Sequence, residues 1–300
     1  MVDTVIFCGG GNRSFWQAGF WSAVSQRRAL APRRVLAVSA GAFVAAGLFS
    51  GTIDGLLDSA SRRFRANPGN FHGRRLLRLQ RPFPHPPIYR ACLEDNLDQA
   101  ALTRLQRAPA IHVLTASPPG WLPLAASLTL SSACYFAEKF LWRSVHARAG
   151  RRLGFRPHWH RLQDCAGSGA MVDLICASSC VPPFFPVRRF GGNTALDGGY
   201  VDSNPLPRAD EFPQPLGTTL VLLTRRYRRL PQSPTVRYVQ PSVPLPVANF
   251  DATAWQGVRA AFALGLRDGE RYLDEHGMSG GAPSPDTDIR PQQPAAGARA

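Results

Sequence analysis

The sequence predicts an α/β fold built on a parallel sheet, and two observations near its start carry this prediction. The short apolar run Val5–Phe7 is followed by three glycines and then, from Ser14 onward, by apolar residues at helical spacing. A second apolar run, Val35–Val38, leads into another helical pattern that begins near Ala40. A strand–helix–strand–helix order of this kind is typical of parallel sheets.

The remaining regular elements follow in order. The run from Ile111 to Thr115 predicts a third strand, and Thr218–Thr224 predicts a buried one. Helices are expected over Gly120–Trp142 and Val172–Cys180, and the prolines after Val181 prevent the second helix from continuing. A closing helix is expected over Trp255–Leu273, with Gly265 as a point where it could break.

Other segments have less regular patterns. Residues 62–90 are rich in arginine and proline and predict an irregular insertion, while Arg143–Arg156 and Leu230–Pro246 are expected to be a link and a loop. Residues 278–300 are rich in glycine, proline and alanine, which is typical of a disordered tail. We therefore expect residues 1–277 to form one domain.

Composition narrows the class of protein. With 300 residues, 44% of them hydrophobic, the chain can bury a substantial core. The net charge of +15 comes almost wholly from arginine, since Lys139 is the sole lysine. No arginine run is interleaved with aromatics as in a nucleic-acid module, so we expect no nucleic-acid partner. Solubility is the simplest role for this charge, and peripheral contact with an anionic membrane is a second one. Oligomeric state is left open.

No segment has the pattern of a signal peptide or a membrane span. Met1–Thr4 lacks basic residues, and the apolar stretch Ala125–Phe140 is interrupted by Glu138 and Lys139. The six cysteines show no CxxC spacing, which favours free thiols and a reducing cytoplasm. We therefore expect a cytoplasmic protein.

Metal binding is not expected either. Cys176 and Cys180 lie four residues apart, and His158 and His160 lie near Cys165, but buried thiols and plain loop histidines explain both patterns. We therefore expect neither a metal nor an organic cofactor.

The glycine run Gly9-Gly10-Gly11, followed by Asn12 and Arg13, predicts a loop that receives negative charge. Glycines at a strand-to-helix junction let the backbone approach a ligand, and the N–H groups there lie at the positive end of a helix. A phosphate is one such charge, as in a nucleotide-binding module. A dinucleotide fingerprint, however, requires a glycine where Ser14 stands and an acidic residue about twenty positions on, whereas Arg27–Arg34 is basic. The oxyanion of a reaction intermediate is the alternative.

A serine between small residues marks the second strand-to-helix junction. In Ala37-Val38-Ser39-Ala40-Gly41, a sharp turn would lift the Ser39 hydroxyl clear of the backbone, and small neighbours are required because larger side chains would collide across the turn. A plain helix N-cap is the alternative interpretation. Later, Asp197-Gly198-Gly199 forms either a plain turn or a site for a carboxylate.

Taken in order, GGGNR, AVSAG and DGG resemble the patatin-like phospholipase family, with its Gly-Gly-Gly-x-Arg loop, Gly-x-Ser-x-Gly nucleophile and Asp-Gly-Gly/Ala turn. The segment Ala177–Pro186 is similar to a further family feature, and the likeness spans roughly residues 5–207. Two positions depart from the family pattern, because Ala37 replaces the first elbow glycine and Pro183 stands where glycine is usual.

The resemblance implies a three-layer α/β/α sandwich that hydrolyses lipid esters. Ser39 would be the nucleophile, Asp197 the base that takes its proton, and Gly9, Gly10 and Gly11 the oxyanion donors. Burial would favour such a base by raising the pKa of a carboxyl group. Arg13, Gly41, Gly198 and Gly199 would support the site.

Other functions remain open at this stage. Seven histidines are present, and one of them could complete a Ser-His-Asp triad. Leu122–Phe140 and Phe184-Phe185 could line an acyl channel or belong to the core, and the arginines of the insertion could meet phosphate head groups. A non-catalytic lipid-binding relative is a further alternative, and the same dyad would serve a thioesterase or a carboxylesterase.

Overall fold

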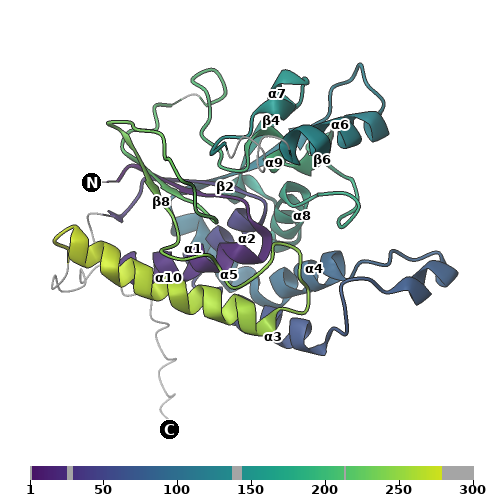
Figure 1. Ribbon diagram of the computed structural model, residues 1–300, viewed down its shortest axis with the longest axis horizontal. Coiled ribbons are helices and arrows are strands. Elements are labelled where there is room, and N and C mark those ends of the chain that lie inside the picture. The colour runs from purple at the N-terminus through teal and green to yellow at the C-terminus, as the bar shows by residue number, and fades with distance from the viewer. Residues whose placement is uncertain (1, 26–29, 137–143, 213, 279–300) are drawn as a thin grey trace, which may run out of the picture.

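The computed structural model describes residues 2–25, 30–136, 144–212 and 214–278. Within them a mixed sheet runs in the order β5-β6-β3-β2-β1-β7-β8, and β4 also pairs with β3 (Figure 1). Parallel pairing joins five of the strands, and β4, β5 and β6 pair antiparallel. The strands are β1 Thr4–Phe7, β2 Arg34–Val38, β3 Ala110–Ser117, β4 Arg156–Arg161, β5 Arg188–Phe190, β6 Asn193–Asp197, β7 Thr219–Leu222 and β8 Val236–Val239.

The α/β class and the mostly parallel sheet are as predicted. The helical elements are η1 Gly11–Ser14, α1 Phe15–Val24, α2 Ala40–Phe49, α3 Ile53–Ala66, η3 Gly73–Arg78, α4 His85–Asn96, α5 Gln99–Arg107, α6 Leu124–Phe136, α7 Ala149–Arg152, η5 Leu162–Asp164, α8 Ser168–Ser178, α9 Gly199–Asp202 and α10 Trp255–Glu275. None of the described helices is both long enough and apolar enough to cross a membrane.

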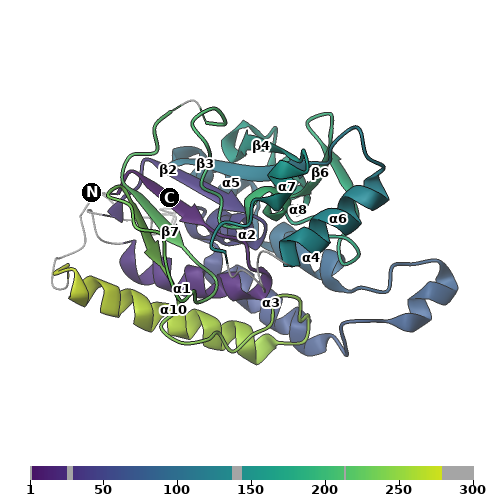
Figure 2. The ribbon, with the colours of Figure 1, turned by 45° about the horizontal axis from the view of Figure 1, so that its top comes forward.

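The sheet is covered on both faces, which makes the fold an α/β/α sandwich. Val5 and Phe7 of β1 belong to the large core cluster under α1, α2, α3 and α10, and these helices lie along one side of the sheet (Figure 2). Ile6 and Cys8 point to the other face, where Val145 and Tyr227 cover them. Because both faces are buried, β1 is a continuous apolar run rather than an alternating one.

The closing helix runs unbroken through Gly265 because α1 packs directly against this glycine. A Cβ atom at Gly265 would lie 2.1 Å from the carbonyl oxygen of Trp16, and one at Gly19 would lie 2.0 Å from that of Phe262. The indole N–H of Trp16 also donates to Asp268 across the same contact at 2.8 Å. Glycine therefore allows two helix backbones to touch here, and the helix does not break at Gly265.

The irregular insertion is shorter than predicted. Helix α3 continues to Ala66, and α4 begins at His85 with prolines in its first turn. Proline is tolerated there because the N–H groups of the first turn have no partner within the helix. Residues 67–84, called the arm below, are the irregular part, and they project from the body of the molecule (Figures 1 and 2). The predicted range was too long because α3 has an apolar face despite its arginines, and because the prolines stand at the start of a helix and do not interrupt one.

Two further predictions need correction. The expected link at Arg143–Arg156 and the expected loop at Leu230–Pro246 contain α7 and β8. Both elements are only four residues long, and β8 lies at the edge of the sheet, so no apolar period marks them. Two predictions fall partly or wholly outside the described residues. These are the part of the predicted helix Gly120–Trp142 that follows Phe136, and the predicted tail after Met278.

Candidate active site

Ser39 lies at a sharp turn between β2 and α2. Its φ of 55° and ψ of −133° are strained for a non-glycine residue, and the side chain is half-buried. A Cβ at Gly41 would lie 2.3 Å from the carbonyl oxygen of Phe7, so only glycine lets α2 start this close to β1. Ala37 has negative φ, which explains why alanine is tolerated there. This geometry is that of a nucleophile elbow.

A second serine holds the elbow in place. The backbone N–H of Ser39 donates to the Ser178 hydroxyl at 2.8 Å, and that hydroxyl donates to the carbonyl oxygen of Leu114 at 2.7 Å. Val38 and Leu114 are partners in the parallel ladder of β2 and β3, so continued pairing would join the Ser39 N–H to Leu114 directly. The Ser178 hydroxyl bridges the gap where the two strands separate. No local sequence pattern marks Ser178 for this role.

Asp197 approaches Ser39 from the opposite direction. Three strands pair with β3. In the numbering of β3, strand β4 pairs with residues 112–117, β2 pairs with residues 110–114, and β6 pairs with residues 115–116. A strand has two edges, and β4 occupies one of them over residues 112–117, which include positions paired with β2 and positions paired with β6. Strands β2 and β6 must therefore follow one another along the other edge, one running toward the junction from each side. The last residue of β6 is Asp197 and the residue after β2 is Ser39, so both lie at this junction.

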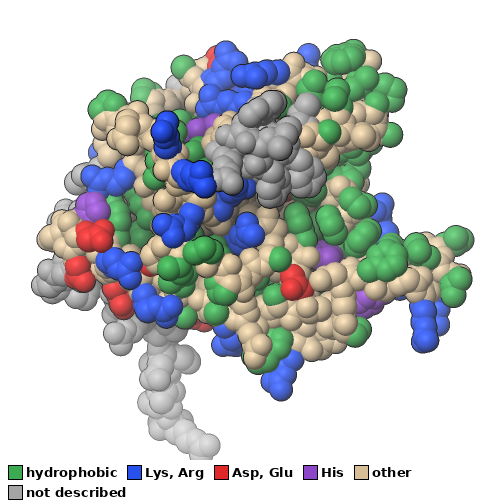
Figure 3. Space-filling view, in the orientation of Figure 1, with side chains coloured by type: hydrophobic (Ala, Val, Ile, Leu, Met, Phe, Trp, Pro, Cys, Tyr) green, Lys and Arg blue, Asp and Glu red, His purple; other side chains and the backbone are tan. Residues whose placement is uncertain are grey.

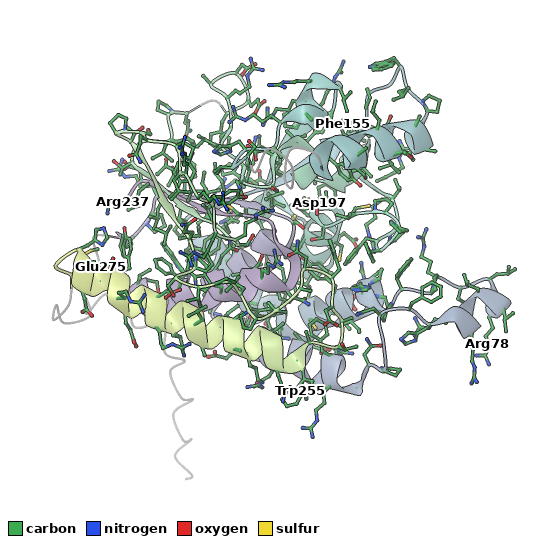
Figure 4. The ribbon with its side chains drawn as sticks, viewed as in Figure 1. Arg78, Phe155, Asp197, Arg237, Trp255 and Glu275 are labelled. Atoms are coloured by element: carbon green, nitrogen blue, oxygen red, sulfur yellow. The ribbon has the colours of Figure 1, made fainter. Side chains whose placement is uncertain are left out.

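The glycines after Asp197 have a steric explanation. A Cβ at Gly198 would lie 2.6 Å from the Leu114 carbonyl oxygen and 2.7 Å from Cγ2 of Val38, directly before Ser39. The Gly199 N–H donates to Oδ1 of Asp197 at 2.6 Å and fixes the carboxylate. Asp197 is only 4% exposed and lies near the centre of the molecule, distant from Arg78 at the end of the arm (Figure 4).

The glycine loop lies beside the elbow. A Cβ at Gly9 would be 3.4 Å from the Cβ of Ser39. The N–H of Gly9 donates to the Ser203 carbonyl at 2.8 Å, whereas the N–H groups of Gly10 and Gly11 have no acceptor among the described residues. Of the three predicted donors, Gly10 and Gly11 thus have N–H groups available for an oxyanion.

The loop is braced from behind by the segment before α10. A Cβ at Gly10 would lie 2.4 Å from the hydroxyl of Thr224, and Gly11, with φ +56°, would place one 2.1 Å from the Asn249 carbonyl. Arg13 donates its Nε–H to the Val247 carbonyl at 3.1 Å, and the Asn12 amide donates to that of residue 251 at 2.7 Å. Protein atoms thus pack against the Cα atoms of Gly10 and Gly11, so residues with side chains would not fit at these two positions.

An apolar cavity of about 70 Å³ begins at Ser39 and the loop. Its wall includes side chains of α2, α3 and α4, among them Phe43, Phe64 and Ile88, and reaches His85 and Phe250. Tyr89 also lines it and shares a 2.8 Å hydrogen bond with Ser179. Burial raises the pKa of Tyr89 well above its usual value, so this side chain remains a neutral hydroxyl. The wall of the cavity next to Ser39 is therefore mainly apolar.

The histidines and cysteines have other roles. His158 and His160 form hydrogen bonds with Ser117 and Thr115 at 2.7 and 3.0 Å, and burial lowers the pKa of both imidazoles. In the described part of the chain no histidine bonds to the Ser39 side chain, and no three potential ligands gather around a metal position. Burial raises the pKa of Cys176 and Cys180 to about 11 and about 12, which keeps both thiols neutral.

Comparison with known proteins identifies the family of the chain. A search of curated proteins found no match. Among solved structures, the crystal structure of VipD from Legionella pneumophila aligns with a TM-score of 0.44 and 12% sequence identity, over 92% of this chain and 67% of that one. The family model of the patatin-like phospholipases matches residues 5–210, a range that includes the glycine loop, the elbow and the Asp197 turn. The chain is therefore a member of the patatin-like phospholipase family, which supports a lipid acyl hydrolase in general terms.

Proposed function

We propose that the protein hydrolyses lipid esters through a two-residue centre of Ser39 and Asp197. The observation that carries this proposal is the meeting of β2 and β6 along one edge of β3, which brings both residues to a single junction. The family match supports the general chemistry, and the strained turn at Ser39 supports its assignment as the nucleophile.

In the first half of the reaction, the Ser39 hydroxyl attacks the ester carbonyl carbon while its proton passes to the Asp197 carboxylate. The carbonyl oxygen becomes an oxyanion that accepts hydrogen bonds from the N–H groups of Gly10 and Gly11, and each such donor contributes about 3–4 kcal/mol to transition-state stabilisation. The N-terminal end of α2 adds a favourable dipole. Asp197 then returns the proton to the leaving alcohol.

In the second half, water attacks the acyl-Ser39 ester. Asp197 takes a proton from the water, and the same two N–H groups stabilise the second oxyanion. The Ser39 oxygen leaves and recovers its proton from Asp197, which releases the fatty acid. The apolar cavity beside Ser39 favours an acyl chain as the bound part of the substrate.

We further propose a reducing compartment, the cytoplasm, as the site of action. Cys92, Cys165, Cys176 and Cys180 carry free thiols, and thiols of this kind are typical of reducing compartments.

Active-site labelling tests the proposal. A fluorophosphonate reacts with an activated serine, so we expect mass spectrometry to locate the label on Ser39 in the wild type and in Ser179→Ala, a control in the same cavity. Ser39→Ala should take no label and should not hydrolyse phospholipid vesicles or p-nitrophenyl butyrate. Label on another serine, or turnover by Ser39→Ala, would exclude the assignment. A thermal shift with NAD, NADP or ATP would instead favour the nucleotide-binding alternative.

A further inference from the structure

The arm, residues 67–84, exposes large apolar side chains to solvent. Leu77 is 87% exposed and Leu79 is 100% exposed, and Phe71 and Leu76 are each more than half exposed. Leu79 also has a φ of 54°, a conformation that leucine rarely adopts. Leucines on an exposed turn are unfavourable in water, so a contiguous group of them marks a surface that contacts something apolar.

The charge of the arm indicates what that contact is. Arg74, Arg75, Arg78 and Arg81 lie among the leucines, and the chain has no acidic residue between Asp58 and Glu94. None of these four arginines forms an ion pair within the described residues. Figure 3 shows hydrophobic and basic side chains together at the outer end of the arm. Apolar side chains flanked by arginines complement the interface of an anionic bilayer.

The base of the arm is fixed to the body of the protein. The Asn70 amide donates to Asp251 at 3.0 Å and its oxygen accepts the Ala252 N–H at 2.7 Å. The two legs of the arm are joined by a 2.8 Å hydrogen bond from the His72 N–H to the Pro82 carbonyl. These hydrogen bonds fix the base of the arm to the body and join its two legs.

Aromatic rings connect the arm to the cavity. Phe71 packs against Phe83 at a centroid distance of 5.6 Å, Phe83 against Phe184 at 5.1 Å, and Phe184 stacks on Phe250 at 4.8 Å. Phe250 lines the cavity that begins at Ser39. A continuous apolar path therefore leads from the exposed arm to the cavity that we assign to the acyl chain.

We propose that the arm docks the protein on anionic lipid bilayers. Leu76, Leu77 and Leu79 enter the interface, the arginines contact lipid phosphates, and the aromatic path receives an acyl chain. The inference deepens the proposed lipid hydrolysis and rests on it for its purpose. A second copy of the chain fits this surface less well, because two arms with four arginines each would repel one another.

Vesicle sedimentation with the Ser39→Ala protein tests the docking without degrading lipid. We expect binding to phosphatidylcholine vesicles that contain about 30 mol% phosphatidylglycerol, at least about tenfold weaker binding to pure phosphatidylcholine, and loss of binding as salt rises above roughly 0.1 M. Equal binding to both vesicles, or binding to neither, would overturn the proposal.

Two arm variants with matched controls locate the contact. Leu77→Ser/Leu79→Ser and Arg74→Gln/Arg78→Gln should each weaken binding about tenfold or more, while Val243→Ser and Arg228→Gln/Arg229→Gln, at exposed positions outside the arm, should bind as before. Thermal melting checks that each variant folds. Unchanged binding of both arm variants would contradict the inference. A wild-type dimer in size-exclusion chromatography that Leu77→Ser/Leu79→Ser abolishes would instead assign the surface to self-association.

Because binding is read on the Ser39→Ala protein, the two proposals fail separately. Vesicle binding without any hydrolysis by the wild type would contradict the proposed function and leave the docking intact. Hydrolysis of soluble esters without vesicle binding would contradict the docking and leave the proposed function intact.

Discussion

The candidate site and the arm use the same residue types under opposite conditions. Around Ser39, glycines lie against backbone atoms, as at Gly11 and Gly198, where an added Cβ would come within 3.0 Å of a carbonyl oxygen. In the arm, a Cβ at Gly69 would meet nothing within 4 Å. Apolar side chains of the central strands β1 and β2 are buried, whereas Leu79 of the arm is fully exposed. The first pattern is the one that the proposed catalytic centre requires, and the second is the one that the proposed contact surface requires.

Paired glycine substitutions should give the largest difference between the two regions. Gly198→Ala would force a methyl group into the Leu114 carbonyl and Val38, so we expect about 1–3 kcal/mol of lost stability and loss of about 99% of kcat/KM, because a small displacement of Asp197 disrupts proton transfer. Gly69→Ala has open space and should leave stability within about 1 kcal/mol of the wild type. Urea unfolding and ester hydrolysis measure both. Similar losses for the two variants would abolish the distinction.

The Ser178 bridge should give an intermediate effect. Ser178→Ala leaves the Ser39 N–H and the Leu114 carbonyl without their shared partner, which costs about 1–3 kcal/mol for buried groups. We also expect kcat to fall about tenfold, since the elbow loses its support. Ser61→Ala is the matched control, because that buried hydroxyl donates to the Leu57 carbonyl of its own helix, away from the elbow. If the two serines proved equivalent, the bridge would have no role in the site.

The smallest effect concerns how stability depends on pH. We expect this dependence to arise from a residue in the body of the protein and not from the arm. Burial lowers the pKa of His112 on β3 to about 4. The unfolded chain therefore binds this proton first, near its ordinary pKa of about 6.5, and stability present above that pH is lost as pH falls toward about 4. The melting temperature should decline over this window, less steeply in His112→Gln. Leu77→Ser/Leu79→Ser should retain the wild-type profile. A flat profile in the wild type would contradict the burial of neutral His112.

The sequence pointed to those parts of the candidate site that lie at the ends of apolar runs. Gly10, Ser39 and the first helices could be found because a strand signal, small residues and a helical period stand side by side. Strand β6 was not predicted, since Asn193–Asp197 is short and mixes polar with apolar residues. Ser178 could not be assigned its bridging role, because its partners lie 64 and 139 residues away in the sequence. Such contacts depend on strand register, which a single sequence does not reveal.

The arm shows a different limit of sequence analysis. Its arginines and prolines marked residues 62–90 as irregular, but the ends of that range proved to be helical at α3 and α4. The exposure of Leu77 and Leu79 could not be predicted either, because a Leu-Leu-Arg-Leu run is equally typical of a buried helix face. Only the tertiary structure separates the two cases.

Kinetics of p-nitrophenyl butyrate hydrolysis by Ser39→Ala, Asp197→Asn and the double variant test most directly whether the two residues act as one unit. Groups that act together show non-additive losses, so we expect each single substitution to lower kcat by a factor of about a thousand or more and the double variant to be no worse than either. Near wild-type turnover by Asp197→Asn, or losses that multiply in the double variant, would show that the carboxylate does not serve the serine.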